Sequence, residues 1–294
     1  MDTVSAAAAG THDLGGGLVV HRLGFGAMRV TGEDVWGPPD DWDRSIRVLR
    51  RAVELGVNFL DTADSYGPGV SEELIAEALH PYPEGVVVAT KGGLTRPSPG
   101  EWPRDGRPEH LREALDGSLR RLRVDRIDLY QLHAPDPDVP YEESVGALKD
   151  FQDAGKVLRV GVSNVDLDEL EIARGIVEVA SVQNRFNLKD RSSEDVLDRC
   201  QELGIAFIPW FPLAAGKLAK GSGLLRRKPE PLARIAKRLE ATPAQVALAW
   251  LLARSPVMLP IPGTSSLDHL EENVRAASIE LSAEEVEELA EVGE

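Results

Sequence analysis

The sequence predicts an α/β protein folded as a single (β/α)8 TIM barrel. Short apolar runs alternate with amphipathic stretches along the chain, there are eight such runs, and no Gly/Ser linker or shift in composition divides the 294 residues. Eight βα units in one undivided domain of this length fit a closed barrel better than a doubly wound sheet. We therefore expect one domain over residues 1–294, in which the alanine-rich residues 1–10 form a frayed tail.

The expected strands are short apolar runs that break off into polar residues. The run 86–90 is apolar without interruption, which is typical of a strand buried on both faces. Two shorter apolar pieces flank Gly15, Gly16 and Gly17 and predict a β-hairpin ahead of the barrel. The eight expected strands cover residues 23–28, 59–60, 86–90, 126–132, 157–162, 180–183, 205–209 and 257–261.

The stretches between the strands carry apolar residues at helical spacing. In the first of them Ile46 and Leu49 fall on one side, arginines fall elsewhere, and Gly56 ends the pattern. Thr242 is placed to cap the helix that follows it. The expected helices cover residues 43–56, 71–79, 108–122, 141–154, 167–179, 192–203, 231–240, 243–254, 267–277 and 283–292.

Composition excludes several classes of partner. The net charge of -16 and the pI near 4.9 argue against nucleic acid or an anionic membrane surface. No apolar run approaches the roughly 20 residues that a membrane span needs. The single cysteine, Cys200, excludes an internal disulfide and fits a reducing compartment, so we expect a cytoplasmic protein. Cys200 lies among apolar residues at helical spacing, so we expect its side chain to pack in the core. No His, Asp or Glu residues stand at metal-ligand spacing, so no metal is expected.

Polar and aromatic residues follow directly on most of the expected strands. Taken singly each has an ordinary explanation, such as a capping aspartate, a strand-end lysine, a loop histidine or a helix cap. A barrel, however, brings the carboxyl ends of its strands into one ring, where these side chains would meet. The residues concerned are Asp61, Tyr66, Lys91, His133, Ser163, Asn164, Gln183 and Trp210.

The first four of these residues form a chemical set. A tyrosine has an ordinary pKa of about 10 and exchanges protons poorly near neutrality. We expect the ammonium of Lys91 to lower the pKa of Tyr66, the carboxylate of Asp61 to hold Lys91, and His133 to orient a carbonyl oxygen beside the phenol. Such a site would protonate an oxygen while a hydride arrives at the attached carbon.

The joint pattern, from about Leu23 to Leu281, resembles the aldo-keto reductase family. Within that family the chain is most similar to bacterial oxidoreductases that include pyridoxal reductases, through Trp36-Gly37-Pro38-Pro39 and the segment 261–266. The matching motifs are Asp61-Thr62-Ala63 with Tyr66-Gly67, Ala89-Thr90-Lys91, Leu132-His133, Gly161-Val162-Ser163-Asn164, Gln183-Asn184, Ile261-Pro262-Gly263-Thr264 and Glu271-Glu272-Asn273.

The resemblance implies NADPH-dependent reduction of an aldehyde or ketone on a barrel whose base the hairpin closes. It implies that Tyr66 is the general acid, that Lys91 and Asp61 tune it, and that His133 positions the substrate carbonyl. The implied contacts to the nicotinamide carboxamide are Ser163, Asn164 and Gln183, with Trp210 as the stacking ring where the family usually has tyrosine. The resemblance also implies that Leu213, Gly216 and Lys217 lie in a loop that closes over the pyrophosphate and that Glu272 and Asn273 hold the adenine. The other implied cofactor residues are Phe211, Pro212, Ile261, Gly263, Thr264, Ser265 and His269.

One departure from the family pattern bears on the cofactor. Members that strongly prefer NADPH place Lys or Arg where this chain has Gly263, Thr264, Ser265 and His269. Loss of such a pairing with the 2′-phosphate removes about 1.5–3 kcal/mol. The hydroxyls and the N-terminus of the helix that follows can still donate to a phosphate, so NADPH is the expected cofactor and NADH use stays open.

The substrate is less well defined. Trp36 and Trp102 are expected to line its pocket, which favours a flat or aromatic carbonyl compound such as pyridoxal. Two other functions remain: a redox sensor that binds the cofactor with little turnover, and an isomerase or aldolase that uses Lys91 as a Schiff base. The complete set of four favours the reductase over the sensor, and a Lys91 kept charged by Asp61 disfavours a Schiff base. The oligomeric state stays open.

Overall fold

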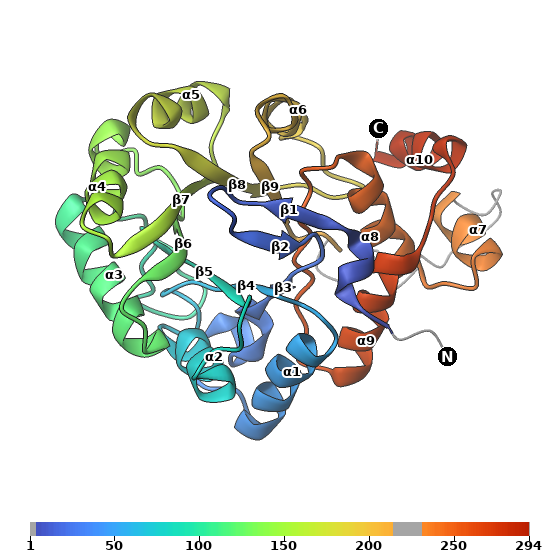
Figure 1. The fold of residues 1–294 in the computed structure, drawn as a ribbon, viewed down its shortest axis with the longest axis horizontal. Helices are drawn as coiled ribbons and strands as arrows, with labels where there is room; N and C mark the ends of the chain where they lie inside the picture. Colours follow the sequence, from blue (N-terminus) through green and yellow to red (C-terminus); the bar gives the residue numbers. More distant parts are fainter. Residues whose placement is uncertain (1–3, 214–230, 294) are drawn as a thin grey trace.

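A ring of parallel strands surrounded by helices forms the body of the molecule (Figure 1). The computed structural model describes residues 4–213 and 231–293. Seven strands follow one another around the ring, each hydrogen-bonded in parallel to the next, which confirms the predicted α/β barrel. They are β3 (Phe25–Gly26), β4 (Phe59–Asp61), β5 (Val87–Gly92), β6 (Ile127–Leu132), β7 (Val157–Ser163), β8 (Val179–Arg185) and β9 (Ala206–Trp210).

The eighth expected strand, 257–261, is an extended segment with too few ladder bonds to count as a strand. It nevertheless closes the ring, because Leu259 N donates to Phe207 O at 2.8 Å on one side and Gly24 N donates to Pro260 O at 3.0 Å on the other. Pro260 itself has no N–H to donate, which limits the ladder. The seam is tight: a Cβ on Gly26 would lie 2.7 Å from the carbonyl oxygen of Ile261.

The predicted hairpin is present and covers one end of the barrel. Its strands β1 (Thr11–Asp13) and β2 (Val19–His21) pair antiparallel and lie in front of the ring in Figure 1. His21 N donates to the side chain of Asn58, the residue just before β4, at 2.6 Å. Leu14 and Val20 pack against the residues inside the barrel. The hairpin therefore closes the amino-terminal ends of the strands, and the opposite end stays free for a site.

The expectation of a frayed tail over 1–10 is wrong for the part that the structure describes. Ala6–Ala9 form a 3₁₀ helix capped by the Ser5 side chain, Ala6 is fully buried, and Ala6 N donates to Leu55 O at 2.8 Å. Small alanines fit against the barrel where larger side chains would not, and composition alone did not reveal this docking.

The helices lie close to their predicted bounds and pack around the ring. The capping box of Thr242 with Gln245 sets the start of the helix at Pro243, where the sequence predicted it. Short 3₁₀ helices at Ala27–Val30, Glu33–Val35, Ala276–Ser278 and Glu291–Gly293 were not predicted. The α-helices are α1 (Trp42–Glu54), α2 (Val70–Leu79), α3 (Pro108–Leu122), α4 (Tyr141–Asp153), α5 (Leu167–Ile176), α6 (Glu194–Leu203), α7 (Pro231–Arg238), α8 (Pro243–Arg254), α9 (Leu267–Arg275) and α10 (Ala283–Ala290).

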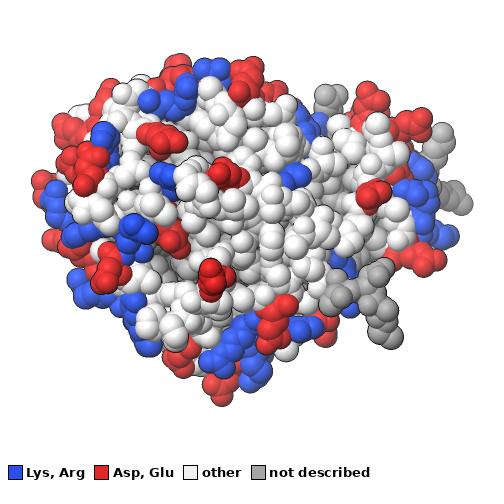
Figure 2. Space-filling view, in the orientation of Figure 1, with Lys and Arg blue, Asp and Glu red and all other residues white. Residues whose placement is uncertain are grey.

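Apolar side chains fill both the space between sheet and helices and the inside of the barrel. Cys200 is buried in the outer layer, and burial raises the pKa of its thiol to about 12, which suits packing and not nucleophilic chemistry. Figure 2 shows charged side chains gathered over the outer helices, with few around the hairpin. Within the described part of the chain no helix is both long and apolar enough to cross a membrane.

Candidate active site

A cavity of about 1140 Å³ opens at the carboxyl ends of the strands. Gly216 and Lys217 lie outside the described residues, and Lys91 and Trp36 do not line the cavity. The predicted residues that do line it are Asp61, Tyr66, Trp102, His133, Ser163, Asn164, Gln183, Trp210, Phe211, Pro212, Leu213, Ile261, Gly263, Thr264, Ser265, His269, Glu272 and Asn273.

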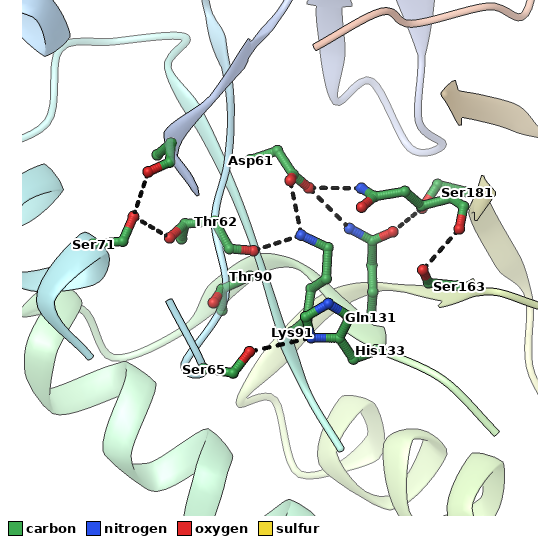
Figure 3. Close-up of polar contacts among 12 residues, drawn as sticks. Asp61, Thr62, Ser65, Ser71, Thr90, Lys91, Gln131, His133, Ser163 and Ser181 are labelled. Carbon is green, nitrogen blue, oxygen red and sulfur yellow. Dashed lines mark hydrogen bonds and ion pairs between the residues drawn. The ribbon is translucent and has the colours of Figure 1, made fainter. Parts of the chain in front are cut away.

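A buried ion pair joins Asp61, which lines this cavity, to Lys91, which does not (Figure 3). Lys91 is fully buried, and its Nζ donates to Asp61 Oδ1 at 2.8 Å and to Thr62 O at 2.7 Å. The second carboxylate oxygen of Asp61 accepts from Gln183 at 2.8 Å and more weakly from Gln131 at 3.4 Å. Several donors thus meet the carboxylate, as a buried charge requires. Asp61 ends β4 and pairs with Ala89 of β5, two residues before Lys91, which places both side chains on the inner face.

The charge on Lys91 is secure. Burial alone lowers the pKa of Lys91, but Asp61 and Tyr66 more than offset it, so the pKa of the ammonium is raised. A lysine that stays protonated and is shielded from the cavity is unsuited to forming a Schiff base. This geometry disfavours the isomerase or aldolase alternative.

Tyr66 stands between the ion pair and the cavity. Its ring centroid is 5.2 Å from Lys91 Nζ and 5.9 Å from the ring of His133, in an edge-to-face arrangement. Burial raises the pKa of Tyr66, and the charge of Lys91 only partly opposes this. The expected lowering of this pKa is therefore wrong in direction, because the desolvation of the phenolate outweighs the nearby cation. The phenol keeps its proton at neutral pH and can donate it.

His133 follows β6 and is a neutral base in this setting. Burial, together with the charge of Lys91, lowers the pKa of His133 well below its ordinary value. Its Nδ1 lies 3.4 Å from Ser65 Oγ, a residue that the sequence did not single out. A neutral imidazole beside a protonated phenol offers a directed hydrogen bond without placing a second full charge near Lys91.

Hydrogen bonds tie the next strand ends together. Asn164, in the left-handed region at φ 58°, donates to His133 O at 2.9 Å and accepts from Trp210 Nε1 at 3.0 Å. Ser163 Oγ donates to Gln183 O at 2.7 Å. Asparagine tolerates this backbone conformation better than most residues. The network fixes the Trp210 indole at the cavity wall, where a flat ring can lie against it.

The far end of the cavity is rich in groups suited to phosphate and ribose. Thr264 and Ser265 precede α9, whose Ser266 cap accepts from His269 N at 3.4 Å. Sequence reasoning missed Arg29, which lines the same cavity on the 3₁₀ helix after β3. A Cβ on Gly263 would lie 3.8 Å from Arg29 Cγ. Arg29 is exposed and has no ion pair among the described residues; its signal was a lone cation just past a strand end.

At the opposite end of the cavity an aromatic wall faces Tyr66. The ring of Trp102 lies edge-on to Tyr66, with ring centroids 6.3 Å apart. Trp36 lies one layer behind, against the guanidinium of Arg96 at 5.5 Å, so its expected place in the substrate pocket is wrong. The loop that carries Trp36 reaches the cavity instead through Asp34 and Val35. Among the described residues no group of three or more His, Cys, Asp or Glu side chains is placed to hold a metal ion.

Comparisons with known proteins identify the family of the chain and several relatives. The model of the Aldo/keto reductase family matches residues 22–294. The chain is 50% identical over 290 residues to an uncharacterized oxidoreductase of Schizosaccharomyces pombe, covering 99% of this chain and 92% of the relative. It is 41% identical over 272 residues to the pyridoxine 4-dehydrogenase of Escherichia coli K12, covering 90% and 92%. An aldo/keto reductase of Klebsiella pneumoniae solved with NADP and acetate superposes with a TM-score of 0.80 at 28% identity, covering 96% and 94%.

Proposed function

Because the chain belongs to the aldo/keto reductase family, whose members carry out NAD(P)H-dependent carbonyl reduction, we propose that it reduces an aldehyde or ketone to an alcohol with Tyr66 as proton donor. The observation that carries this proposal is the phenol of Tyr66 at the cavity wall, backed by the buried Lys91–Asp61 pair. The bound cofactor supplies the hydride.

Each of the four catalytic residues has a definite task in this proposal. As negative charge develops on the carbonyl oxygen, Tyr66 transfers its proton to that oxygen. The ammonium of Lys91 stabilises the phenolate left behind, and Asp61 keeps Lys91 charged and in place. His133, neutral at pH 7, orients the carbonyl oxygen toward the phenol.

The donor set of the cavity fits a nicotinamide dinucleotide. Trp210 offers a flat face for the nicotinamide, and Asn164 with Gln183 offers amides for its carboxamide. Thr264, Ser265 and the N-terminus of α9 offer donors for phosphate. The remaining proposed contacts are Ser163, Phe211, Pro212, Leu213, Ile261, Gly263, His269, Glu272 and Asn273.

Trp210→Ala is expected to weaken cofactor binding by about 10-fold or more, because it removes a stacking face and frees the side chain of Asn164. Fluorescence titration with NADPH measures the dissociation constant. Trp210→Tyr serves as the control, since it keeps an aromatic face, and should bind within a few-fold of the parent. An alanine variant with unchanged affinity would remove Trp210 from the cofactor site.

We propose NADPH as the preferred cofactor, with Arg29 as the cation that the segment 263–269 lacks. Arg29→Gln should weaken NADPH binding by about 10- to 100-fold, from the loss of a charge-assisted pairing with the 2′-phosphate, and leave NADH binding nearly unchanged. Titrations of the parent protein and of Arg29→Gln with NADPH and with NADH test this. Equal losses for NADPH and NADH would mean that Arg29 does not read the 2′-phosphate.

Pyridoxal is the proposed substrate. Its flat ring suits the wall formed by Trp102, and a relative at 41% identity is named a pyridoxine 4-dehydrogenase. NADPH oxidation with pyridoxal, with pyridoxine identified as product, tests the proposal. Cofactor binding without turnover on any carbonyl compound would favour the redox-sensor alternative instead. A cytoplasmic location stays a prediction from the single cysteine.

A further inference from the structure

Arg96 is a buried cation that the proposed chemistry does not use. Its side chain, in the loop after β5, is only 8% exposed. Its guanidinium lies between two indoles, 3.6 Å from the ring centroid of Trp102 and 5.5 Å from that of Trp36. In the described part of the chain it forms no ion pair, its Nη2 donates to Asp34 O at 3.1 Å, and its Nε and Nη1 are buried without a hydrogen-bond partner.

Burying the Arg96 guanidinium with unpartnered donors lowers the stability of the fold. A buried donor without a partner is unfavourable, and a charged one more so. Stacking on two indoles offsets part of the cost. An apolar side chain would fill the same slot between Trp36 and Trp102 without that cost. What the guanidinium adds is a set of unused N–H donors and a positive charge, which are suited to the oxygens of a carboxylate or phosphate.

The position of Arg96 links those donors to the substrate end of the cavity. Trp102, which covers the guanidinium, is 36% exposed, lines the cavity and touches Tyr66. The Asp34 carbonyl on the other side belongs to a residue that also lines the cavity. The unpartnered donors therefore lie one side chain behind the wall that faces the proposed proton donor.

Backbone strain marks the same place. Asp34 and Val35 both have left-handed backbone angles, at φ 54° and 59°, which is rare for a β-branched residue. Val35 O accepts from Gly67 N at 3.1 Å, next to Tyr66, while Asp34 O holds Arg96. Such strained segments cluster at ligand-binding sites. Here the strained pair joins the guanidinium to the loop of the proposed proton donor.

We propose that Arg96 binds an anionic group of the substrate. In this arrangement the Trp102 indole turns aside, the guanidinium pairs with a carboxylate or phosphate on an aromatic aldehyde, and the carbonyl lies at Tyr66 and His133. The inference rests on the proposed reductase function and narrows its substrate class: aromatic aldehydes that carry a carboxylate or phosphate should be preferred over neutral ones such as pyridoxal. The chain has a net charge of -16, but charges farther than about 8 Å from the site are largely screened. The nearby guanidinium of Arg96 therefore contributes more to the electrostatic potential at an anionic substrate than distant carboxylates do.

The test compares anionic aldehydes with neutral analogues, and it depends on how Arg96→Gln changes each ratio, because the analogues also differ in size and in the fraction present as free aldehyde. The 3- and 4-formylbenzoates are matched to their neutral methyl esters, and pyridoxal 5′-phosphate to pyridoxal, so that the carboxylate and phosphate arms are separate. In the parent at least one anion should show a kcat/KM about 10- to 100-fold above that of its neutral partner, from one or more charge-assisted hydrogen bonds. Arg96→Gln should bring this ratio close to one while the turnover of the neutral compounds persists.

Controls separate anion binding from a structural role. Arg104→Gln removes a charge from the same loop, from a side chain that donates to Pro135 O, and it should leave the ratio unchanged. If Arg96→Gln loses all turnover, Arg96→Lys, which keeps the charge without the planar guanidinium, should lower the ratio and keep ester reduction. An unchanged ratio in the folded variant, a parallel loss for charged and neutral aldehydes, or an equal effect of Arg104→Gln would overturn the proposal.

Failure of the reductase function can be told from failure of this inference by binding alone. Quenching of the protein's tryptophan fluorescence by the formylbenzoates, compared between the parent and Arg96→Gln, measures binding without turnover. Binding that depends on Arg96 but is followed by no reduction would support the anion site and contradict the reductase. Reduction of the esters with no preference for any anion would do the opposite.

Discussion

Replacing Tyr66 by phenylalanine is expected to lower kcat for carbonyl reduction by about 10²- to 10⁴-fold, the usual contribution of a positioned proton donor. The substitution removes one oxygen and leaves the ring contacts with His133 and Trp102 in place. Cofactor affinity should stay nearly unchanged, because Tyr66 is not among the proposed cofactor contacts. Steady-state kinetics with a neutral aromatic aldehyde and a titration with NADPH measure both quantities.

Tyr130 provides a matched control for the same chemical change. It lies in β6, is fully buried, and its hydroxyl has no hydrogen-bond partner among the described residues. Tyr130→Phe should therefore leave turnover unchanged and not destabilise the fold. If Tyr66→Phe keeps substantial turnover while Tyr130→Phe behaves like the parent, the proton must come from another group.

The pH profile gives a second view of the same residue. Burial raises the pKa of Tyr66 and lowers that of His133, so neither group changes its charge near neutrality. Neither Tyr66 nor His133 should therefore add a titration to the rate of reduction between about pH 6.5 and 9. An inflection near pH 8 would belong to Asp64, because burial and the charge of Glu72 raise the pKa of its carboxyl group to about 8. A rate that falls as the pH rises, with a midpoint between about pH 6 and 7, would indicate that a protonated His133 is the acid.

Much of the fold could be predicted because its signals are local. The uninterrupted apolar run in β5, the caps of α5 and α8, and the glycine after α6 each mark a boundary by themselves. The seam between β9 and β3 was less predictable. It depends on prolines that remove donors from the last extended segment and on close backbone contact at Gly26, and neither appears as hydrophobic periodicity.

The residues that form the site could be predicted because the carboxyl ends of the barrel strands meet in one ring. The direction in which the pKa of Tyr66 shifts could not. Whether the cation beside Tyr66 outweighs the loss of water around it depends on burial, which sequence does not provide, and here burial prevails. Arg29 and Arg96 escaped notice because each belongs to a turn whose course depends on tertiary contacts. Tryptophan is a residue type suited to a ligand pocket, but the ring of Trp36 lies against the guanidinium of Arg96.

Removing the charge of Lys91 is the change expected to cost the fold most among those considered. Lys91→Met leaves the Asp61 carboxylate buried with only the amides of Gln183 and Gln131 as donors. Breaking a buried pair in this way costs about 3–5 kcal/mol. With an unfolding entropy of about 2 cal/mol/K per residue, a chain of 294 residues should lose about 5 to 8 °C in Tm. Calorimetry measures the shift.

A double-mutant cycle distinguishes the pair from its members. Asp61→Asn alone should also destabilise, but Asp61→Asn combined with Lys91→Met should recover part of the Tm, because no unpaired charge is left. Turnover should not recover with it, since nothing then stabilises the phenolate of Tyr66. Lys149→Met serves as the surface control: the Lys149–Asp153 pair is exposed, and its loss should shift the Tm by less than about 1 °C. Additive losses in the buried cycle would mean that Lys91 and Asp61 act independently.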